Sequence, residues 1–404
     1  MGKIRYVIVG SGWRSLYYVR VAKALPEKFE LCAMLCRSEE KAEKMADEYG
    51  IYTTVSIEEC RSLKPDFVVV VVNKADIAKV SMEWLNNGFT VLCETPAALD
   101  TDTLKQLWEL HKSGKKLVVA EQYTKYPTYD AMLKALDTGI IGEPDCLNIS
   151  LAHEYHGASL IRAFLRQNVD TQFTVRAKTY EFTTVETLNR YERFTDGRTA
   201  KKKRTTATFE FDDGKVAFYD FDSEQYRSPI RKNYVKVQGR IGELKDDTFY
   251  YLDEDYQDRQ AKLVVKERYV HTGNANPNLR DVREILSINL DKENIKNGTA
   301  GEAFEVHQVY EAPFGACGLA EDETAIARLM VETAEYDKVF VNTENKESVL
   351  DIGTEKNAKN MEIAERMDKE LRGALQDAYT AILLAEAVKT GTEVASEKQP
   401  WQYE

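Results

Sequence analysis

The sequence predicts an α/β protein in two parts: a parallel sheet with helices between its strands, then an α+β region with an antiparallel sheet. Three observations predict this. The first third alternates apolar runs with amphipathic stretches, which is the pattern of βαβ units. A glycine-rich turn follows the first apolar run directly. After about residue 122 the pattern changes to period-two alternation, and 404 residues suffice for two cores at roughly 100 to 200 residues per domain.

Apolar runs and capping residues predict the elements of the first part. The predicted strands are Arg5–Val9, Leu31–Leu35, Phe67–Val72, Thr90–Cys93 and Leu117–Ala120. Ser38 is the expected N-cap of a helix that stops at Gly50. Another helix is predicted over Asp100–Lys112, with Gly114 as its end. His111 falls on the apolar face of that helix, so we expect no functional role for it.

The second part mixes helical spacing with strand-like alternation. Its predicted elements are a helix at Thr128–Thr138 ending in Gly139, a strand at Leu147–Leu151, antiparallel strands between Thr179 and Val264, and helices at Asp322–Tyr336 and Asn357–Lys389. The last of these segments is predicted to be more than one helix. The expected domains are therefore residues 1–122 and residues 123–404.

Charge and composition exclude some classes of partner. The net charge of −12 argues against a nucleic-acid surface, because phosphate binding requires a broad patch of Lys and Arg. One basic run, Lys201–Arg204, lies between strand-like segments beside the turn signal Asp196-Gly197. A solvated hairpin explains this run better than a binding patch does.

Cysteine usage and hydropathy predict a cytoplasmic protein. The six cysteines are scattered, form no Cys-x-x-Cys pair and lie partly in apolar runs, as expected for reduced thiols. The first predicted strand begins at Arg5, so we expect no signal peptide. The longest apolar run, Phe67–Val72, is too short to cross a bilayer, and no membrane association is expected.

The turn after the first strand has the spacing of a dinucleotide-binding fingerprint. Gly10 and Gly12 occupy the first two glycine positions, and Ser15 occupies the third. Gly10 would allow the tight turn, Gly12 would let a pyrophosphate approach the backbone, and Ser15 is small enough for close packing of helix against strand. Strand, turn, helix and second strand follow in the required order. We therefore predict a nicotinamide dinucleotide as cofactor.

The end of the second strand indicates which cofactor. An acid there would accept hydrogen bonds from the ribose 2′-hydroxyl, but this chain has Arg37 and Ser38, and no acid before Glu39. A guanidinium and a hydroxyl suit a 2′-phosphate, so NADP(H) is predicted in preference to NAD(H), which remains the alternative. The candidate cofactor-binding residues come from this turn and from other strand ends: Gly10, Ser11, Gly12, Trp13, Arg14, Arg37, Ser38, Asn73, Lys74, Glu94 and Thr95.

These segments together resemble the Gfo/Idh/MocA family of NAD(P)-dependent oxidoreductases. The resemblance covers most of the chain and is carried, in order, by Gly10–Ser15, Val91–Pro96 in place of the family's Glu-Lys-Pro segment, Gly139–Glu143, Leu375–Tyr379 and Gln399–Trp401. It implies an N-terminal Rossmann domain and a C-terminal substrate-binding domain with a large open antiparallel sheet. It further implies sugar or cyclitol-like substrates and, through the sheet face, a homodimer or homotetramer.

Two departures from the family pattern affect the chemistry. The family's Glu-Lys-Pro lysine handles the proton of the substrate hydroxyl, and Thr95 stands in its place. The family's later Asp and His segment is also altered, because Leu151–Gly157 occupies that region. Threonine does not exchange a proton near neutral pH, so another group must take that role.

His156 is the first candidate for that role, because an unperturbed histidine titrates near neutrality and Gly157 beside it would permit a turn. Tyr123 and Lys125, just past the Leu117–Ala120 strand, are the next candidates, and Lys74, beyond the Phe67–Val72 strand, is another. Arg162 is a candidate for holding a substrate oxygen. His153 and His156 are alternatively a hydrogen-bonded structural pair. Their i, i+3 spacing and the lack of a third ligand argue against a metal site, so none is predicted.

Two classes of function fit this pattern. The first is an oxidoreductase that acts on a secondary hydroxyl or ketone of a carbohydrate or cyclitol-like substrate. The alternative, suggested by Thr95, is a non-catalytic NAD(P)-binding sensor or regulatory protein of the same fold.

Overall fold

The computed structural model describes residues 2–189, 192–226, 228–271, 281–294, 307–311, 319–339 and 354–403. These residues form two compact units. The first contains the described parts of Met1–Gln122, Asp322–Tyr379 and Gln399–Glu404, and the second those of Tyr123–Glu321 and Thr380–Lys398. The first unit thus takes in a late segment of the chain in addition to the first 122 residues. The assignment of cofactor binding to one domain and substrate binding to the other stays a prediction.

The first unit is built on a parallel sheet, as predicted. Among the described residues its six strands have the order β3-β2-β1-β4-β5-β6. They are β1 (Ile4–Val9), β2 (Phe29–Leu35), β3 (Thr53–Thr54), β4 (Phe67–Val70), β5 (Val91–Cys93) and β6 (Leu117–Val119). The chain order reverses between β1 and β4, and parallel sheets bind ligands at the carboxyl ends of their strands beside such a reversal. The glycine turn follows β1 at this point.

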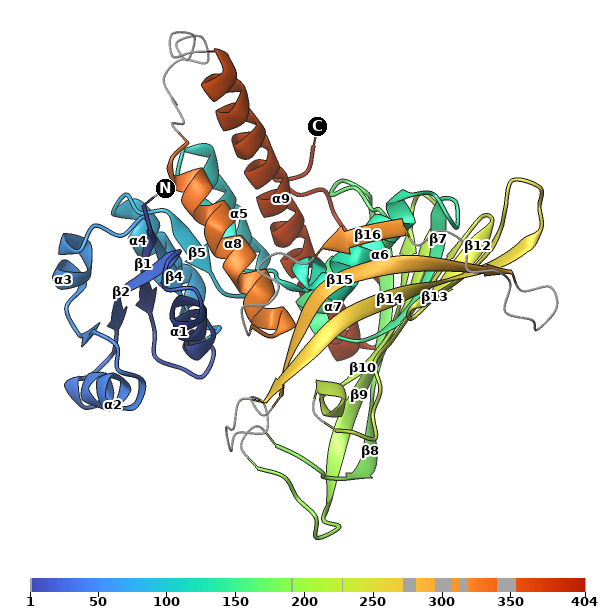
Figure 1. Ribbon diagram of the computed structural model, residues 1–404, viewed down its shortest axis with the longest axis horizontal. Helices are drawn as coiled ribbons and strands as arrows, with labels where there is room; N and C mark the ends of the chain where they lie inside the picture. The colour runs from blue at the N-terminus through green and yellow to red at the C-terminus, as the bar shows by residue number, and fades with distance from the viewer. Residues whose placement is uncertain are drawn as a thin grey trace. The chain divides into compact units, whose positions relative to one another are not determined.

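Helices pack around this sheet (Figure 1). They are α1 (Ser15–Ala24), α2 (Glu39–Tyr49), α3 (Ile57–Ser62), α4 (Ile77–Asn86) and α5 (Thr101–Lys112). The predicted caps are present: the Ser38 hydroxyl accepts a hydrogen bond from the Lys41 amide, and Gly50 ends α2 with a φ of 60°. Asp100 caps α5 in the same way, by accepting from the Thr103 amide.

Two late helices contribute to the first unit, the first of them from Asp322 on and the second as far as Tyr379. Helix α8 spans Glu321–Asp337, close to its predicted bounds. Helix α9 spans Thr354–Thr390 as one element of 37 residues, so the prediction of more than one helix was wrong. No proline interrupts the segment, and its one glycine, Gly373, is tolerated because Leu371 and Leu375 on either side are buried.

The second unit contains the predicted antiparallel sheet. Its eleven strands, counted over the described residues, have the order β16-β15-β14-β13-β12-β11-β7-β10-β9-β8-β17, and all neighbours are antiparallel except β7 and β10. The strands are β7 (Pro144–Ser150), β8 (Phe173–Val185), β9 (Thr199–Phe211), β10 (Val216–Asp222), β11 (Tyr234–Gly239), β12 (Gly242–Lys245), β13 (Thr248–Leu252), β14 (Asp258–His271), β15 (Asp281–Asn294), β16 (His307–Glu311) and β17 (Val394–Ala395).

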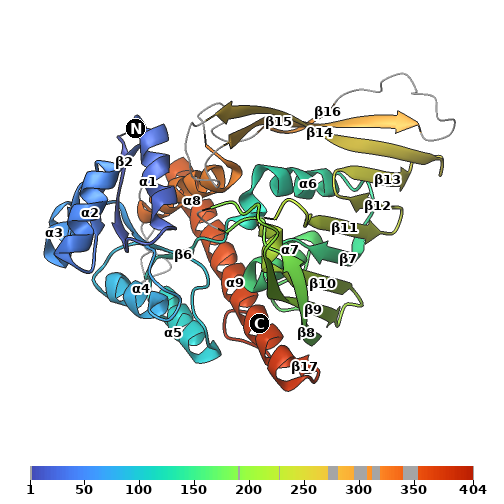
Figure 2. The same cartoon turned by 90° about the horizontal axis from the view of Figure 1, so that it is seen from below.

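Helices α6 (Pro127–Asp137) and α7 (Glu154–Phe164) lie along the same face of this sheet (Figure 2). Two short 3-10 turns, η1 (Tyr123–Lys125) and η2 (Ser223–Tyr226), belong to the same unit. The predicted fold class, a parallel-sheet domain followed by an α+β domain with a large mostly antiparallel sheet, is therefore confirmed.

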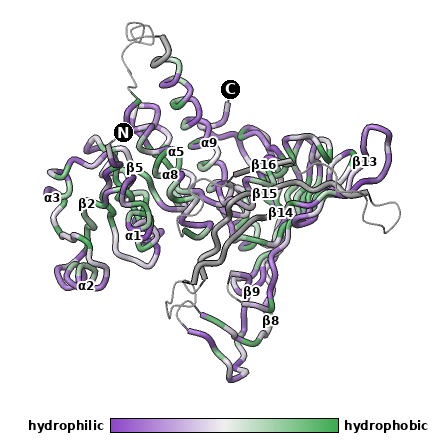
Figure 3. The backbone as a smooth tube through the Cα atoms, viewed as in Figure 1, coloured by the Kyte–Doolittle hydropathy of each residue, from purple (hydrophilic) through white to green (hydrophobic). Residues whose placement is uncertain are grey.

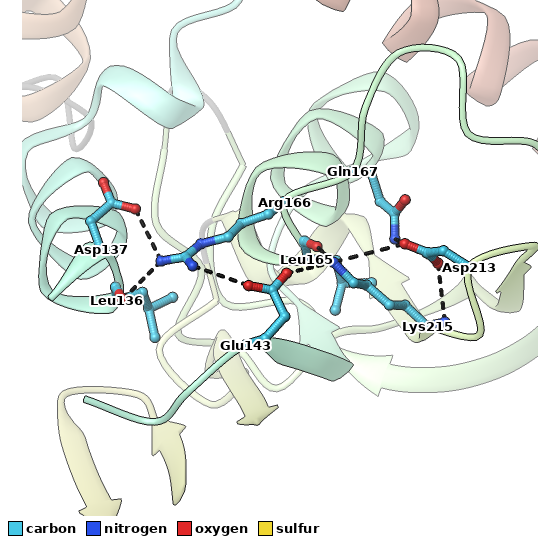
Figure 4. Close-up of polar contacts among 8 residues, drawn as sticks. All are labelled: Leu136, Asp137, Glu143, Leu165, Arg166, Gln167, Asp213 and Lys215. Carbon is cyan, nitrogen blue, oxygen red and sulfur yellow. Dashed lines mark hydrogen bonds and ion pairs between the residues drawn. The ribbon is translucent and has the colours of Figure 1, made fainter. Parts of the chain in front are cut away.

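Ion pairs hold α7 in place in the second unit (Figure 4). Glu143 accepts hydrogen bonds from Lys215 Nζ at 2.8 Å and from Arg166 Nη1 at 3.2 Å. Lys215 Nζ also donates to the Leu165 carbonyl at 2.8 Å, and Arg166 Nη2 donates to the Leu136 carbonyl at 2.8 Å. The hydrogen bond from Lys215 is the main reason why the pKa of Glu143 lies below its ordinary value. The network joins the end of α7 to α6 and to the β9–β10 turn.

The basic run Lys201–Arg204 lies in β9, which forms a hairpin with β8, as predicted. Strand alternation exposes Lys201 and Lys203, while Lys202 pairs with Glu186 at 2.7 Å. Arg204 pairs with the fully buried carboxylate of Asp222, also at 2.7 Å. Half of this run is therefore part of the hydrogen-bonded structure of the sheet.

Hydrophobic residues are concentrated in the strands of the first unit, whereas α2 is predominantly hydrophilic (Figure 3). The central strands β1 and β4 are almost fully buried, as expected for a sheet covered on both faces. Across the part of the chain that the structure describes, no helix combines the length and apolar character needed to cross a bilayer.

Candidate functional site

The glycine turn has the geometry that a pyrophosphate requires. Gly10 has a φ of +118°, and a Cβ there would lie 2.1 Å from the Val71 carbonyl oxygen, so only glycine fits. A Cβ on Gly12 would meet no atom within 4 Å, which leaves the backbone open to a ligand. Ser15 is fully buried, and its hydroxyl donates to the Gly12 carbonyl at 2.5 Å. The residues therefore fit a dinucleotide at the N-terminus of α1.

The side chains of this turn have other partners. Trp13 is 45% exposed and meets the Tyr17 ring edge-on, with the ring centroids 5.7 Å apart. Burial raises the pKa of the Cys36 thiol, and a hydrogen bond with Ser11 opposes that rise. Backbone amides at the turn thus remain the groups best suited to a phosphate, while the side chains fix the shape of the turn.

Arg14 is the most connected residue of the turn. Its Nε donates to Glu94 at 2.7 Å, and its Nη1 donates to Asp322 at 2.7 Å. The Gln122 amide, oriented with its oxygen toward the guanidinium, accepts from Nη2 at 3.0 Å. The Tyr18 hydroxyl also donates to Glu94, at 2.8 Å. Burial, followed by the charge of Glu94, raises the pKa of Tyr18 well above its ordinary value.

The candidate cofactor residues that lie beyond the ends of β2 and β4 are exposed. Arg37 and Ser38 follow β2 at the surface, and the Ser38 hydroxyl is already the N-cap of α2. Asn73 and Lys74 follow β4, and Asn73 Oδ1 accepts from the amides of Ala75 and Asp76 at 3.0 and 3.2 Å. Asn73 therefore shapes the turn that leads into α4.

The Glu94-Thr95-Pro96 turn begins where β5 ends. The Glu94 amide donates to the Val70 carbonyl at 3.0 Å, and the Thr95-Pro96 peptide is cis. The carboxylate of Glu94 is buried, and it also accepts from the Thr95 amide at 3.3 Å. Glu94 thus connects its own turn to the glycine turn through Arg14.

The second unit places the predicted catalytic residues beside each other. His156 lies in the first turn of α7 and is 5% exposed. Its ring packs on the Tyr123 ring with a centroid separation of 4.3 Å, and on Tyr155 at 4.4 Å. Lys125 belongs to the same 3-10 turn as Tyr123, and α7 contacts this turn. Sequence positions more than 30 residues apart therefore meet in one cluster.

His153 connects to two tyrosines that the sequence did not single out. Its Nε2 and the Tyr155 hydroxyl are hydrogen-bonded at 3.0 Å, and its Nδ1 is hydrogen-bonded to the Tyr226 hydroxyl. The His153 ring meets the His156 ring edge-on, with centroids 5.1 Å apart. This arrangement is a hydrogen-bonded aromatic cluster rather than an isolated histidine pair.

The expectation that Gly157 permits a turn was wrong, because Gly157 lies inside α7. A Cβ at this position would lie 2.6 Å from the Tyr219 ring. Glycine is needed here for the close approach of that ring. The Tyr219 hydroxyl in turn accepts from the Glu154 amide at 3.1 Å and donates to the Ala152 carbonyl at 2.9 Å, which fixes the start of α7.

Comparison with known proteins gives a family match for the N-terminal part of the chain. Residues 4–123 match the family described as "Oxidoreductase family, NAD-binding Rossmann fold", the Gfo/Idh/MocA family. This segment, which carries the glycine turn and the parallel sheet, is therefore similar to the Rossmann domain of that family. The resemblance seen in the sequence is thereby confirmed for this segment. No curated protein sequence matches the chain at a significant level.

Solved structures share the fold over nearly the whole chain. An NAD-binding oxidoreductase from Klebsiella pneumoniae aligns with a TM-score of 0.60 at 13% identity, covering 98% of this chain and 100% of that one. A scyllo-inositol dehydrogenase from Lactobacillus casei aligns with a TM-score of 0.55 at 13% identity, covering 98% of each chain. An Agrobacterium radiobacter oxidoreductase, in complex with NAD+, L-tartaric acid and magnesium, aligns with a TM-score of 0.55 at 12% identity, covering 97% of this chain and 98% of that one. At these identities the likeness establishes the fold alone.

Within the first unit, sequence reasoning missed the ion pairs of the Arg14 side chain and its link to α8. Asp322 lies 308 residues after Arg14, and no local pattern pairs them. In the second unit it missed Tyr155 and Tyr226, although the position of Tyr155 between two histidines was a signal for the first. The cofactor and catalytic roles predicted from the sequence, and that of Arg162 in α7, stay predictions.

Proposed function

We propose that this protein is an NAD(P)-dependent oxidoreductase that acts on a secondary hydroxyl or ketone of a carbohydrate or cyclitol-like substrate. The observation that carries the proposal is the glycine turn, in which Gly10 is required by geometry and the space over Gly12 is open, within a segment similar to the Gfo/Idh/MocA Rossmann domain. The scyllo-inositol dehydrogenase among the structures of the same fold supports the substrate class. NADP(H) is the proposed cofactor, because Arg37 and Ser38 follow β2.

The bound nicotinamide would accept or supply the hydride, and the residues of the chain would hold the cofactor and move the proton. The backbone of Gly10, Ser11, Gly12 and Trp13 would hold the pyrophosphate at the N-terminus of α1. His156 would take the proton of the substrate hydroxyl in the oxidation and return it in the reduction. This role is supported by the packing of the His156 ring between Tyr123 and Tyr155, which fixes its orientation. Tyr123 and Lys125 are the alternative proton carriers in the same turn.

The proton role is tested by His156→Asn and His156→Ala. We expect turnover with a panel of sugars and cyclitols to fall by roughly two to four orders of magnitude while cofactor affinity stays unchanged. His111→Asn is the control, because His111 is also a helix histidine but lies outside the cluster, with its ring hydrogen-bonded to Asp368 at 3.0 Å. Near-normal turnover of both His156 variants would refute the assignment.

Cofactor choice is tested separately by titrating the wild-type protein with NADPH and NADH and following the fluorescence of the reduced nicotinamide. Tighter binding of NADPH is expected, with Arg37→Ala reducing that preference and leaving NADH affinity nearly unchanged. Tighter binding of NADH by the wild-type protein would contradict the proposal for NADP(H).

The second candidate is a non-catalytic NAD(P)-binding sensor or regulator of the same fold. Thr95 favours it, because the residue cannot exchange a proton near neutral pH. A protein that binds cofactor but never changes the nicotinamide absorbance with any substrate of the panel would support the sensor. Thr95→Lys sharpens this test, since a gain of dehydrogenase turnover would show that only the proton-transfer group was missing.

Three further expectations accompany the oxidoreductase proposal: a homodimer or homotetramer, a cytoplasmic location, and no nucleic-acid or membrane partner. The net charge of −12 supports the exclusion of nucleic acid. Light scattering coupled to size-exclusion chromatography tests the assembly, and a monomer at micromolar concentration would contradict it.

A further inference from the structure

Arg14 joins three chain segments that are distant in sequence. Its guanidinium bonds Glu94 after β5, Gln122 after β6, and Asp322 at the start of α8. The Arg14 side chain is only 13% exposed, and that of Glu94 only 9%. All three nitrogens of the guanidinium therefore have protein partners.

A second arginine of α1 provides an internal comparison. Arg20 pairs with Glu323, the residue after Asp322, at 2.6 Å, and the Glu323 side chain is 5% exposed. Both guanidinium groups also lie over the Tyr17 ring, at 4.6 Å for Arg14 and 4.2 Å for Arg20. Burial raises the pKa of Glu323, and the charge of Arg20 opposes that rise. Both arginines thus join α1 to α8 in a similar way, but Arg14 alone of the two also bonds the turn after β5.

The Arg14 contacts fix one loop of the cofactor site against another. Arg14 stands at the N-cap position of α1, directly after the glycine turn, and Glu94 immediately precedes Thr95 and the cis peptide. A planar guanidinium directs its N–H groups toward three partners from three separate nitrogens, whereas the N–H groups of an ammonium diverge from a single nitrogen. Loss of the guanidinium would leave the buried Glu94 carboxylate without its charged partner and free its turn to shift.

The geometry points to Arg14 as a positioning residue for the nicotinamide cofactor. Its guanidinium holds the Glu94-Thr95 turn in register with the glycine turn, and Asp322 of α8 completes the support. This inference rests on the proposed cofactor site. It assigns the Arg14 side chain to the alignment of two cofactor-binding turns, rather than to a bond with a cofactor phosphate.

The test compares Arg14→Met with Arg20→Met. Each variant removes an arginine of α1 that pairs with an acid of α8, so we expect both to lower the melting temperature. Only Arg14→Met should weaken binding of NADPH and NADH, by roughly tenfold or more, the scale on which loss of a buried charge-assisted hydrogen bond acts. Arg14→Lys should give an intermediate loss, because one ammonium group keeps the charge but not all the bonds. Affinities are measured by the fluorescence of the reduced cofactors.

The outcomes separate this inference from the proposed function. If the wild-type protein binds the cofactors and the cofactor affinities of Arg14→Met and Arg20→Met agree within twofold, the inference alone is overturned. A wild-type protein that binds neither cofactor would overturn the proposed function and the inference together. If Arg14→Met does not fold, the cofactor affinities of Arg14→Lys and Arg20→Lys are compared in its place. Asp322→Asn, which keeps both Arg14 and Glu94, should weaken cofactor binding less than Arg14→Met does, and an equal or larger loss would contradict the central role of the guanidinium.

Discussion

The two candidate sites, the glycine turn of the first unit and the His156 cluster of the second, differ in the groups that they offer to a ligand. In the first unit the side chains around the glycine turn are bonded to protein groups: Ser38 caps a helix, Asn73 shapes a turn and Arg14 pairs with acids. The groups that would hold a pyrophosphate there are backbone amides. In the second unit the candidate groups are side chains, with His156 packed on Tyr123 and Tyr155.

This difference predicts different responses to substitution. A backbone site is sensitive to any atom added at its glycines, and its side chains affect it by holding its turns in place. A side-chain site is sensitive to the loss of one group and to the packing that aims it. It also explains why glycine spacing predicts the first site well, whereas the second depends on residues that only tertiary structure brings together.

The largest effect is expected at Gly10. Gly10→Ala would place a Cβ 2.1 Å from the Val71 carbonyl oxygen at a φ of +118°, so we expect a loss of about 3 kcal/mol or more in the free energy of unfolding. Gly12→Ala is the matched control, because its Cβ meets nothing within 4 Å; its stability should change by about 1 kcal/mol or less. Urea unfolding measures both.

The cofactor affinity of Gly12→Ala tests whether a ligand binds at the backbone of the glycine turn. The Gly12→Ala protein should fold normally and still bind NADPH and NADH more weakly, because its methyl group would occupy the open approach to the turn. Wild-type affinity in Gly12→Ala would show that no ligand approaches this backbone, and the contrast between the two units would then fail.

The next effect is expected at Gly157 in the second unit. Gly157→Ala places a Cβ 2.6 Å from the Tyr219 ring, and overpacking of this kind costs about 1 to 3 kcal/mol. The strain displaces the first turn of α7, so turnover should fall with stability. Adding Tyr219→Leu makes room for the methyl group, and the double variant should be less destabilised than the sum of the single ones. If the losses of the two single variants in the free energy of unfolding simply add, the methyl group of Gly157→Ala does not clash with the Tyr219 ring.

The parts of the fold that local chemistry determines were predictable from the sequence. Ser38 and Gly50 mark the ends of α2 because capping depends on neighbouring residues alone, and the apolar runs of β1 and β4 follow from burial on both faces. The segment of α9 was predicted to be more than one helix, but it forms a single helix that continues through Gly373. Burial of the residues around that glycine, which is a tertiary effect, keeps the helix intact.

The parts of the candidate sites that depend on long-range contacts were not predictable. Tyr226 reaches His153 across 73 residues, and Asp322 reaches Arg14 across 308. Neither tyrosines nor acids are unusual enough in sequence to indicate such partners. Gly157 was noticed, but its ring contact with Tyr219 depends on the position of β10 beside α7.

A smaller effect, dependent on pH, is expected at Asp368 in the first unit. Burial of its carboxyl opposes ionisation, but hydrogen bonds with His111 and Arg372 outweigh burial and lower its pKa. A lowered pKa means that the ionised group stabilises the fold at pH values above the unfolded pKa, about 3.9, and that this contribution is lost as pH falls further. Asp368→Asn should cost about 1 kcal/mol at pH 7, discounted for the partial exposure of the side chain. The gap to the wild-type protein should narrow below about pH 4.

The smallest effect is expected at Glu143 in the second unit. The hydrogen bond from Lys215 lowers the pKa of Glu143, so its contribution has the same sign and is also lost on acidification. The Glu143 side chain is 60% exposed, however, against 33% for Asp368, and solvent screens its pairs with Arg166 and Lys215. Glu143→Gln should therefore cost under about 0.5 kcal/mol at pH 7, as measured by urea unfolding. A loss larger than that of Asp368→Asn would mean that the ion pairs of Glu143 with Arg166 and Lys215 determine the stability of the second unit. The packing of His156 in α7 would then depend on charge as much as the glycine turn does.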